Sequence, residues 1–459
     1  MPEKALVTLE ETLGALLEAK KYNTLRDVLV TMNASDIAAI FEDMPEEKLP
    51  LLFRLLPKEQ AADTFVEMEA EVQELLIQGF SDNELKEVVD ELYVDDAVDI
   101  VEEMPANVVK RILKQADPEK RKMINDILQY PEDSAGSIMT TEYVSLRPDM
   151  TAEEAIKRIR RTGVDKETIY NCYVTDGNRK LIGTVSIRTL LLCETDDVLM
   201  DIMESNVISV GTLEDQESVV QMFAKYNFVA LPVVDQENRL VGIVTIDDAI
   251  DVLQEETTED FEKLAGMTPS DKPYLRTGVL ETWRSRIPWL MILMLSATLT
   301  SMVLTGFEAS LAACSALIAF IPMLTGTGGN SGTQSSVAVI RALALGEVEF
   351  VDGLRVLWKE LRVALLCGVT LAGCNFVKLL LVDRLLLGNE DVSVLVAAVI
   401  CVTMVLSVLC AKIVGCLLPL LAEKIHLDPA VMASPFISTV VDVTTLLIYF
   451  QVARAILGI

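Results

Sequence analysis

Two stretches of the chain combine apolar sequence with residues that could bind a metal ion. Residues 321–336 read IPMLTGTGGNSGTQSS, with glycines at 326, 328, 329 and 332 and two amide side chains, Asn330 and Gln334, among them. Residues 429–457 are apolar except for a few hydroxyls, one glutamine, one arginine and a single acid, Asp442. Carboxylate, amide and backbone carbonyl oxygens are the hard ligands that Mg²⁺ prefers. The two stretches therefore predict a path for a hydrated cation.

The glycine run predicts an interrupted helix. Non-helical backbone at membrane depth persists only where it lines water or is buried in protein, and its freed carbonyls would then face the ion. The predicted ion pathway consists of Thr325, Gly328, Gly329, Asn330, Ala433, Ser434 and Asp442. Two alternatives stay open. The glycines could serve a close helix crossing of the small-residue type, and Asp442 could be a structural acid capped by Thr439, Thr444 or Thr445.

The ligand inventory favours magnesium over softer metals. Mg²⁺ keeps several of its waters and is bound through few carboxylates, which suits one acid and several carbonyls. Six of the eight cysteines lie in apolar segments without CxxC spacing, and His426 is the one histidine. Copper and zinc therefore lack their usual thiolate and imidazole ligands, whereas Co²⁺, Ni²⁺ or Mn²⁺ could leak through.

A second set of acids precedes the apolar half of the chain. Residues 245–262 read TIDDAIDVLQEETTEDFE, and helical spacing places several of their like charges on one face. We predict that cytosolic Mg²⁺ bridges such acids and holds a closed state, with domains separating when Mg²⁺ falls. The predicted ligands are Asp95, Asp99, Asp215, Glu217, Asp248, Asp251, Glu255, Glu256 and Glu259. The alternative is a solvated acidic face.

The elements that position these residues divide the chain in two. Apolar segments at 287–305, 309–340, 361–382, 392–422 and 429–457 predict five membrane spans. Basic residues in the short connections place the N-terminus in the cytosol and the C-terminus outside. Residues 1–280 hold 28 basic and 57 acidic residues, so they carry about −29 of the total charge of −30. A domain this acidic should repel nucleic acid and attract cations.

Two internal repeats organise the acidic part. ASDIAAIFEDMP (34–45) realigns on VDDAVDIVEEMP (94–105), which predicts an α-superhelix over residues 1–130. CYVTDGNRKLIGTVS (172–186) realigns on LPVVDQENRLVGIVT (231–245), and each copy, of about 60 residues, predicts a strand, helix, strand, turn, strand and helix. This second repeat resembles tandem CBS domains, an α/β fold. The resemblance implies an adenine-nucleotide site, with Thr245 and Asp248 at the ribose and Tyr170 and Arg188 nearby; the alternative is a CBS pair that binds no nucleotide.

The order of these parts, with PMLTGTGGNSGTQ (322–334), LDPA (427–430) and VDVTTLLIY (441–449), resembles the MgtE-type magnesium channel family across essentially the whole chain. The resemblance implies a multidomain protein: a superhelical domain over 1–130, CBS domains over 131–198 and 199–256, a connecting helix over 257–283 and an all-α pore domain of five spans over 284–459. It further implies a homodimer of a bacterial-type inner membrane with the pore at the two-fold axis, Asp428 as a regulatory ligand, and modulation by ATP.

Function is therefore predicted as a Mg²⁺-selective channel for magnesium uptake and not as an enzyme. The spans show no Ser/His, Cys/His or paired-acid constellation that could support catalysis. A proton- or sodium-coupled transporter using Asp442 is the alternative. A scarcity of other titratable groups in the spans argues against such a relay.

Overall fold

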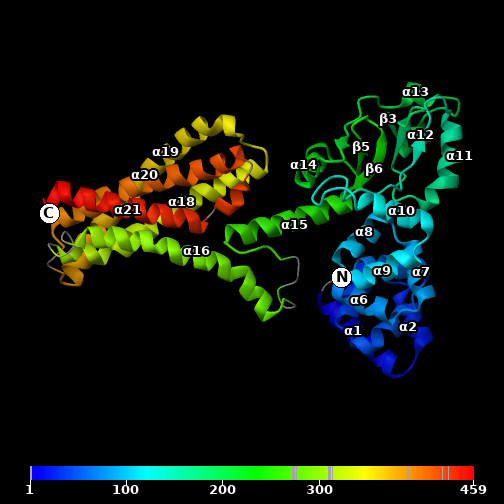
Figure 1. The fold of residues 1–459 in the computed structure, drawn as a ribbon, viewed down its shortest axis with the longest axis horizontal. Coiled ribbons are helices and arrows are strands. Elements are labelled where there is room, and N and C mark those ends of the chain that lie inside the picture. The colour runs from blue at the N-terminus through cyan, green and yellow to red at the C-terminus, as the bar shows by residue number, and fades with distance from the viewer. Residues whose placement is uncertain are drawn as a thin grey trace. The chain divides into compact units, whose positions relative to one another are not determined.

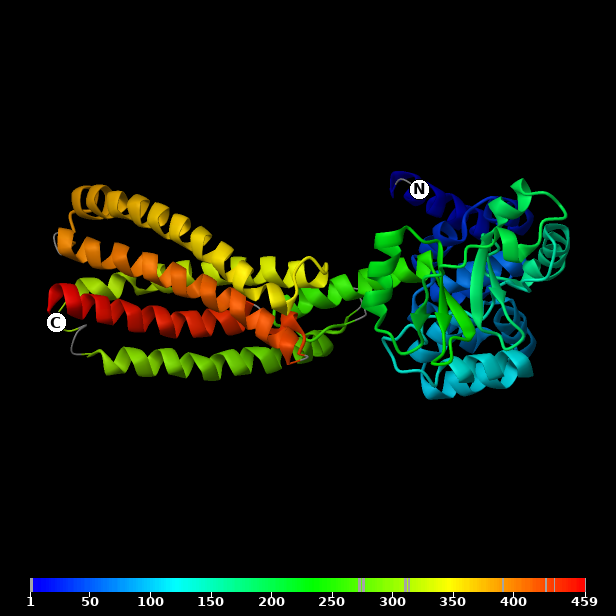
Figure 2. The ribbon, with the colours of Figure 1, turned by 90° about the horizontal axis from the view of Figure 1, so that it is seen from above.

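A computed structural model describes residues 3–270, 274, 277–308, 312, 314–389, 392–425, 427–432 and 434–458. The chain forms two compact units, Met1–Leu253 and Gln254–Ile459. Figures 1 and 2 show the helices and strands of each unit in two views.

The first unit begins with short helices joined by tight turns. They are α1 (Glu3–Glu18), α2 (Tyr22–Leu29), α3 (Ala34–Glu42), η1 (Glu46–Lys48), α4 (Leu49–Phe53), α5 (Lys58–Val66), α6 (Ala70–Gly79), α7 (Asp82–Glu91), α8 (Val94–Glu103), α9 (Ala106–Gln115) and α10 (Pro118–Ile127). The helical N domain predicted from the repeat is confirmed. Equivalent positions of the two copies are both buried, and Phe41 in α3 and Val101 in α8 are one such pair. Pro118 lies in the first turn of α10, where its missing N–H costs little, and Pro57 and Pro105 are the cap residues just before α5 and α9.

The second repeat folds as a pair of small α/β domains. One sheet contains β1 (Ser145–Leu146), β2 (Asn171–Thr175) and β3 (Leu181–Ser186), and the other contains β4 (Val210–Gly211), β5 (Ala230–Val234) and β6 (Leu240–Thr245). In both sheets the first pair of strands is parallel and the second antiparallel. Their helices are α11 (Ala152–Thr162), η2 (Gly163–Asp165), α12 (Ile187–Leu192), α13 (Leu199–Ile202), α14 (Gln216–Tyr226) and α15 (Ile246–Leu264).

Equivalent positions of the two sheets, Gly183 and Gly242, require glycine because a larger side chain would clash with a neighbour. A Cβ added to Gly183 would lie 2.4 Å from Met203 Sδ, and one added to Gly242 would lie 2.6 Å from Met139 Sδ. Each methionine follows an isoleucine, in Ile138-Met139 and Ile202-Met203, so the same dipeptide packs against the glycine in both sheets. The predicted α/β pair is thus confirmed, with the same close packing in each copy.

The second unit is helical. It contains α16 (Val279–Gly306), η3 (Ser315–Phe320), α18 (Ile321–Ala344), η4 (Phe350–Asp352), α19 (Gly353–Lys378), the π-helical η5 (Leu379–Leu386), α20 (Val394–Lys424), η6 (Pro429–Met432) and α21 (Ser434–Leu457). The long helices run side by side as a bundle in both views (Figures 1 and 2). Among the described residues, four helices are long and apolar enough to cross a membrane: Val279–Gly306, Phe350–Leu386, Val394–Lys424 and Phe436–Leu457. α18 is long enough but too polar to join them, so the fifth span stays a prediction.

The predicted interruption of span 2 is wrong, because α18 is one continuous α-helix through the glycine run. Tertiary packing explains why. Gly332 and Gly415 lie at a helix crossing so close that a Cβ on Gly415 would lie 2.2 Å from the Gly332 carbonyl oxygen. The close approach between α18 and α20 outweighs the low helix propensity of glycine. The small-residue crossing is therefore what the glycines provide.

The structure also differs from the single connecting helix predicted over 257–283. α15 runs without a break from the second CBS domain to Leu264, and α16 begins only at Val279. Gly266, with φ of 70°, follows the end of α15 in the left-handed region that glycine adopts easily. The segment therefore contains the ends of two helices, while the domain boundaries remain a prediction.

Candidate functional site

The predicted ion-pathway residues of α18 and α21 lie on neighbouring surfaces. A Cβ on Gly328 would lie 2.9 Å from Thr445 Oγ1 and 3.0 Å from Val441 Cγ1, and one on Gly329 would lie 3.6 Å from Ser438 Oγ. Asp442 is half-buried within this same stretch of α21. The two glycines thus bring the α18 backbone against the helix that carries the intramembrane acid.

Other predicted pathway residues have different surroundings. Asn330 is exposed, and so is Gln334 one turn further along α18. Thr325 donates its hydroxyl to the Ile321 carbonyl at 3.0 Å, a bond within its own helix. Ala433 lies outside the described residues, as does the side chain of Ser434. Within one chain, α18 therefore presents Gly328 and Gly329 to α21 and its two amides to the outside of the bundle.

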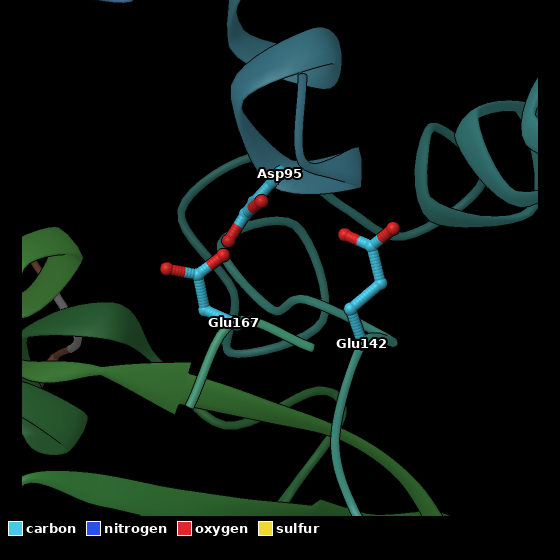
Figure 3. A group of neighbouring side chains, drawn as sticks. All are labelled: Asp95, Glu142 and Glu167. Carbon is cyan, nitrogen blue, oxygen red and sulfur yellow. The ribbon is translucent and has the colours of Figure 1, made fainter. Parts of the chain in front are cut away.

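A compact group of carboxylates lies in the first unit. Asp95, Glu142 and Glu167 each offer one oxygen, and these oxygens all lie within 4.8 Å of one another. Figure 3 shows the Glu167 carboxylate directed at Asp95, with Glu142 on the other side of Asp95 in this view. Three acids this close repel one another unless protons or a cation neutralise them.

Local hydrogen bonds hold the three acids in place. Glu142 accepts from the Val94 N–H at 3.0 Å at the start of α8, and Asp95 accepts from the Asp96 N–H at 3.1 Å. The Glu167 N–H donates to the Glu142 carbonyl at 3.0 Å. Glu167 Oε2 is buried, and no hydrogen-bond partner for it exists among the described residues. That oxygen has acceptor capacity to spare for a cation or a proton.

Burial and mutual repulsion raise the pKa values of this group. Burial, with Asp248 next in importance, raises the pKa of Asp95 well above its usual range and that of Asp99 to about 8. Burial and then the charges of Asp96 and Asp248 raise the pKa of Glu167 to about 8. Burial also raises the pKa of Asp96 to about 6, with Asp248 again the next cause.

Asp248 connects the predicted metal and nucleotide sites. Its carboxylate accepts from the Thr245 hydroxyl at 2.5 Å and from the Thr245 N–H at 3.3 Å, which caps the start of α15. Burial raises its pKa to about 6 against the lowering effect of the Thr245 hydrogen bonds. In the first CBS copy Ser186 accepts from the Thr189 N–H at 3.0 Å, so the equivalent cap there has no acid. Both motifs are helix caps as well as candidate ribose contacts.

The remaining nucleotide candidates are exposed. Tyr170 is 65% exposed and its carbonyl accepts from the Ile187 N–H at 2.9 Å, which places it beside the start of α12. Arg188 is the next residue of that helix and is also exposed. An exposed ring and a cation at one helix start are suited to a base and a phosphate.

The other predicted regulatory acids do not all join one group. Burial, then Asp247 and Glu67, raise the pKa of Asp251. Asp215 caps α14 by accepting from the Glu217 N–H at 2.9 Å, a structural role that accounts for its position. Glu255 is exposed and Glu256 half-buried on α15.

A separate acidic group lies in the second unit around a lysine. Lys263 Nζ lies 2.6 Å from Glu259 Oε1 and 2.6 Å from Asp428 Oδ2. Burial lowers the pKa of Lys263, but its hydrogen bonds to Asp428 and Glu259 raise it by more. Burial, with Asp428 next, raises the pKa of the adjacent Asp260. Two predicted Mg²⁺ ligands are thus brought together, with an ammonium already between them.

Sequence reasoning missed two kinds of residue. Glu142 and Glu167 lie in loops of the first CBS domain, where no periodic pattern marks them. Glu360 and Lys412 form an ion pair at 3.5 Å inside the helical bundle. The bundle therefore holds one titratable pair that the sequence analysis did not single out, because apolar residues surround each charge in the sequence.

Comparison with known proteins places each part of the chain. Residues 321–452 match the family model described as MgtE, divalent cation transporter. Residues 32–133 match the MgtE intracellular N domain, and 135–194 and 199–255 match the CBS domain. The chain is 39% identical over 461 residues to the magnesium transporter MgtE of Thermus thermophilus, covering 100% of this chain and 99% of that one. It is 31% identical to the Bacillus subtilis magnesium transporter MgtE, covering 96% and 95%.

Solved structures resemble the first half of the chain. The cytosolic domain of the Mg²⁺ channel MgtE in complex with ATP has a TM-score of 0.51 and 36% identity, covering 53% of this chain and 99% of that chain. The soluble part of a magnesium transporter has a TM-score of 0.52 and 30% identity, covering 55% and 99%.

Proposed function

Because this chain belongs to the MgtE family of magnesium transporters, we propose that it is a Mg²⁺-selective channel closed by cytosolic Mg²⁺. The observation that carries the gating proposal is the group Asp95, Glu142 and Glu167, whose carboxylate oxygens lie within 4.8 Å of one another. Mg²⁺ would stabilise whichever arrangement keeps such acids together. Transport of an ion, with no catalysis, is the activity proposed.

The proposed ion path uses Asp442 and the helix α18. One half-buried acid beside a close-packed glycine surface can hold a hydrated cation through its waters, as Mg²⁺ requires. The exposed amides Asn330 and Gln334 supply further oxygens if a second copy faces them. We therefore propose a homodimer with a pore at its two-fold axis, in a bacterial-type inner membrane, with the N-terminus cytosolic and the C-terminus outside.

The proposed regulatory ions bind in two places. In the first unit the proposed ligands have raised pKa values, mainly because of burial, and they are Asp95, Asp99, Glu142, Glu167, Asp248 and Asp251. In the second unit Glu259, Asp260 and Asp428 gather at the end of α15. The donor set is all oxygen, and Glu167 Oε2 has no hydrogen-bond partner in the part of the chain that the structure describes, which fits a hard divalent cation.

ATP is proposed as a modulator rather than a substrate. A relative's cytosolic domain has been solved with ATP bound. In this chain Tyr170 and Arg188 lie exposed at the start of α12, and Thr245 and Asp248 offer the ribose contacts. Because Asp248 also belongs to the acidic group, nucleotide and Mg²⁺ occupancy should influence each other.

The decisive experiment is Mg²⁺ current through the purified protein in a voltage-clamped bilayer. Openings without a proton or sodium gradient, suppressed as cytosolic-side Mg²⁺ rises into the millimolar range, support a self-gated channel. The triple variant Asp248→Ala, Asp251→Ala, Glu259→Ala should require more Mg²⁺ for the same suppression. Unchanged Mg²⁺ suppression in that variant would count against these acids as the sensor.

A coupled transporter is the second candidate, and one observation favours it. Glu360 and Lys412 are titratable groups within the bundle, which a proton relay would need. This candidate predicts Mg²⁺ uptake that follows a proton or sodium gradient and vanishes when that gradient is collapsed. A current that needs only the Mg²⁺ gradient would exclude it.

A further inference from the structure

Three helices of the second unit meet at a buried charged triad. Lys412 Nζ on α20 lies 3.1 Å from Ser335 Oγ on α18 and 3.5 Å from Glu360 Oε2 on α19. The Ser335 hydroxyl also donates to Glu360 Oε2. The side chains of Lys412 and Glu360 are 6% and 13% exposed, and Ser335 is 1% exposed. The three groups therefore form a closed triangle of charge-assisted hydrogen bonds.

The triad lies well inside the bundle. Ser335 precedes the end of α18 at Ala344, Lys412 precedes the end of α20 at Lys424, and Glu360 follows the start of α19 at Gly353. At about 1.5 Å per residue these positions lie roughly 10–18 Å from those helix ends. An ion at such a depth is tolerated when it pairs with another inside the bundle.

The energetics of the triad favour a role in specificity. Replacing a buried ion pair by apolar residues of similar size is often neutral for stability, whereas removing one partner leaves an uncompensated charge. Simple cohesion between α18, α19 and α20 would thus be achieved equally well by leucines. What an ion pair adds is a preference for one alignment of its helices, since any other alignment separates the charges.

The close backbone contact between Gly332 and Gly415 does not by itself fix how α18 and α20 align along their axes. One turn from Ser335 and Lys412, a Cβ on Gly415 would lie 2.2 Å from the Gly332 carbonyl oxygen. A smooth contact between glycines allows helices to approach but discriminates weakly between positions along the axis. Ser335 also lies less than two turns from Gly329, where α18 meets Ser438 of α21. A shift of α18 along its axis would move its glycine face past Asp442.

We propose that Lys412 and Glu360 are positioning residues that, through Ser335, fix α18 in one register and so set the geometry of the ion pathway beside Asp442. The transport readout of this inference rests on the proposed function. A second readout, disulfide formation between α18 and α21, reports the register directly. A Cβ on Gly329 would lie 3.8 Å from Ser438 Cβ, which is close to the spacing that a disulfide requires.

The experiment uses purified full-length protein and a small set of variants. Lys412→Met and Glu360→Gln each remove one charge, Lys412→Arg keeps it, and Lys412→Met with Glu360→Gln removes both. Lys359→Met is the matched control, because Lys359 is an exposed neighbour of Glu360 on the same helix. Each variant is assayed for Mg²⁺ flux, for the ratio of Mg²⁺ to Co²⁺ flux, and for the rate of disulfide formation in a Gly329→Cys, Ser438→Cys background.

The expected result separates positioning from stability. Lys412→Met should lower Mg²⁺ flux by roughly tenfold or more and slow disulfide formation severalfold, while Lys412→Arg and Lys359→Met stay close to the parent protein. The double neutral variant should fold as well as the parent but keep the altered ion ratio and the slow disulfide. If Lys412→Met alone fails to fold, the double neutral variant still tests the proposal.

Two outcomes would overturn the inference. One is a double neutral variant with the parent's ion ratio and disulfide rate, since the triad would then only stabilise the bundle. The other is a folded Lys412→Met protein in which neither quantity changes. If the parent protein shows no Mg²⁺ flux without a second gradient, the channel proposal fails, and the disulfide rates still decide the register.

Discussion

Protons and Mg²⁺ should compete for the carboxylate group of the first unit. The pKa values of Asp99 and Glu167 are raised to about 8 and those of Asp96 and Asp248 to about 6, in each case mainly by burial. All four lie above the ordinary values for these side chains, so the folded protein binds protons more tightly than the unfolded chain. A cation needs the ionised carboxylates and must displace those protons.

The magnitude follows from these values. At pH 7 a group with a pKa of about 8 is roughly 90% protonated and one with a pKa of about 6 is roughly 10% protonated, so binding Mg²⁺ would release about two protons. The Mg²⁺ affinity should then rise up to roughly a hundredfold per pH unit near pH 7 and level off above about pH 9. This count takes only those four groups, and Asp99 contributes less than a full proton to it because its side chain reaches solvent.

The stability of the Mg²⁺-free protein should change with pH in the opposite direction to its Mg²⁺ affinity. Groups whose pKa is raised on folding make the folded state more stable as the pH falls from about 9 towards 5, because the folded state takes up protons that the unfolded chain does not. Saturating Mg²⁺ should remove this slope. The assay is thermal unfolding of the full-length protein in detergent between pH 6 and 9, with and without Mg²⁺, together with calorimetric Mg²⁺ titration.

Glu167→Gln provides the control for the proton count. It should reduce the protons released at pH 7 by about one, since Glu167 is one of the two groups largely protonated there. A Mg²⁺ affinity that is the same at pH 6.5 and 8.5 would refute the reasoning. So would a melting temperature that rises with pH in the absence of Mg²⁺.

Three further predictions concern the second unit. Gly415→Ala should destabilise the folded protein by about 1–3 kcal/mol, because its Cβ would meet the Gly332 carbonyl, and thermal unfolding in detergent measures this; an unchanged melting temperature would contradict the close crossing. Lys263→Met should lower the Mg²⁺ concentration for half-suppression of current severalfold, since it removes the ammonium that competes for Asp428; an unchanged midpoint would show that no Mg²⁺ binds there. Asp442→Asn should reduce Mg²⁺ flux by roughly tenfold or more at equal protein level, measured in proteoliposomes, and parental flux would remove Asp442 from the path.

Much of the architecture could be predicted from repeats and periodicity. The duplicated motifs located both the helical N domain and the paired sheets, because equivalent positions such as Phe41 and Val101 are buried for the same reason in each copy. Asp248 was identified in the same way, since the cap that it forms with Thr245 is a local motif. Structural features that depend on residues close together in the chain can be predicted from the sequence.

Features that depend on distant neighbours were not predicted. The glycine run of α18 was expected to break a helix, with a close helix crossing as the alternative, and the contact with Gly415 favours the crossing. Glu142 and Glu167 become a site only when loops of one domain meet the start of α8. Lys412 and Glu360 lie 52 residues apart, and nothing local marks them as partners.

The polarity of α18 has a consequence for how the protein is made. The apolar helix α20 has a mean hydropathy of 2.9 over its best window and can partition into a bilayer by itself, even with Lys412 within it. α18 is not among the described helices that are apolar enough to cross a membrane. Its serines, threonines and glycines would partition poorly into lipid without neighbouring helices. If α18 spans the membrane as predicted, it should not insert as an independent segment in order of synthesis. We expect it to enter the bundle only once α20 and α21, which follow it in the chain, are available to pack against it, as a late and cooperative step of biogenesis.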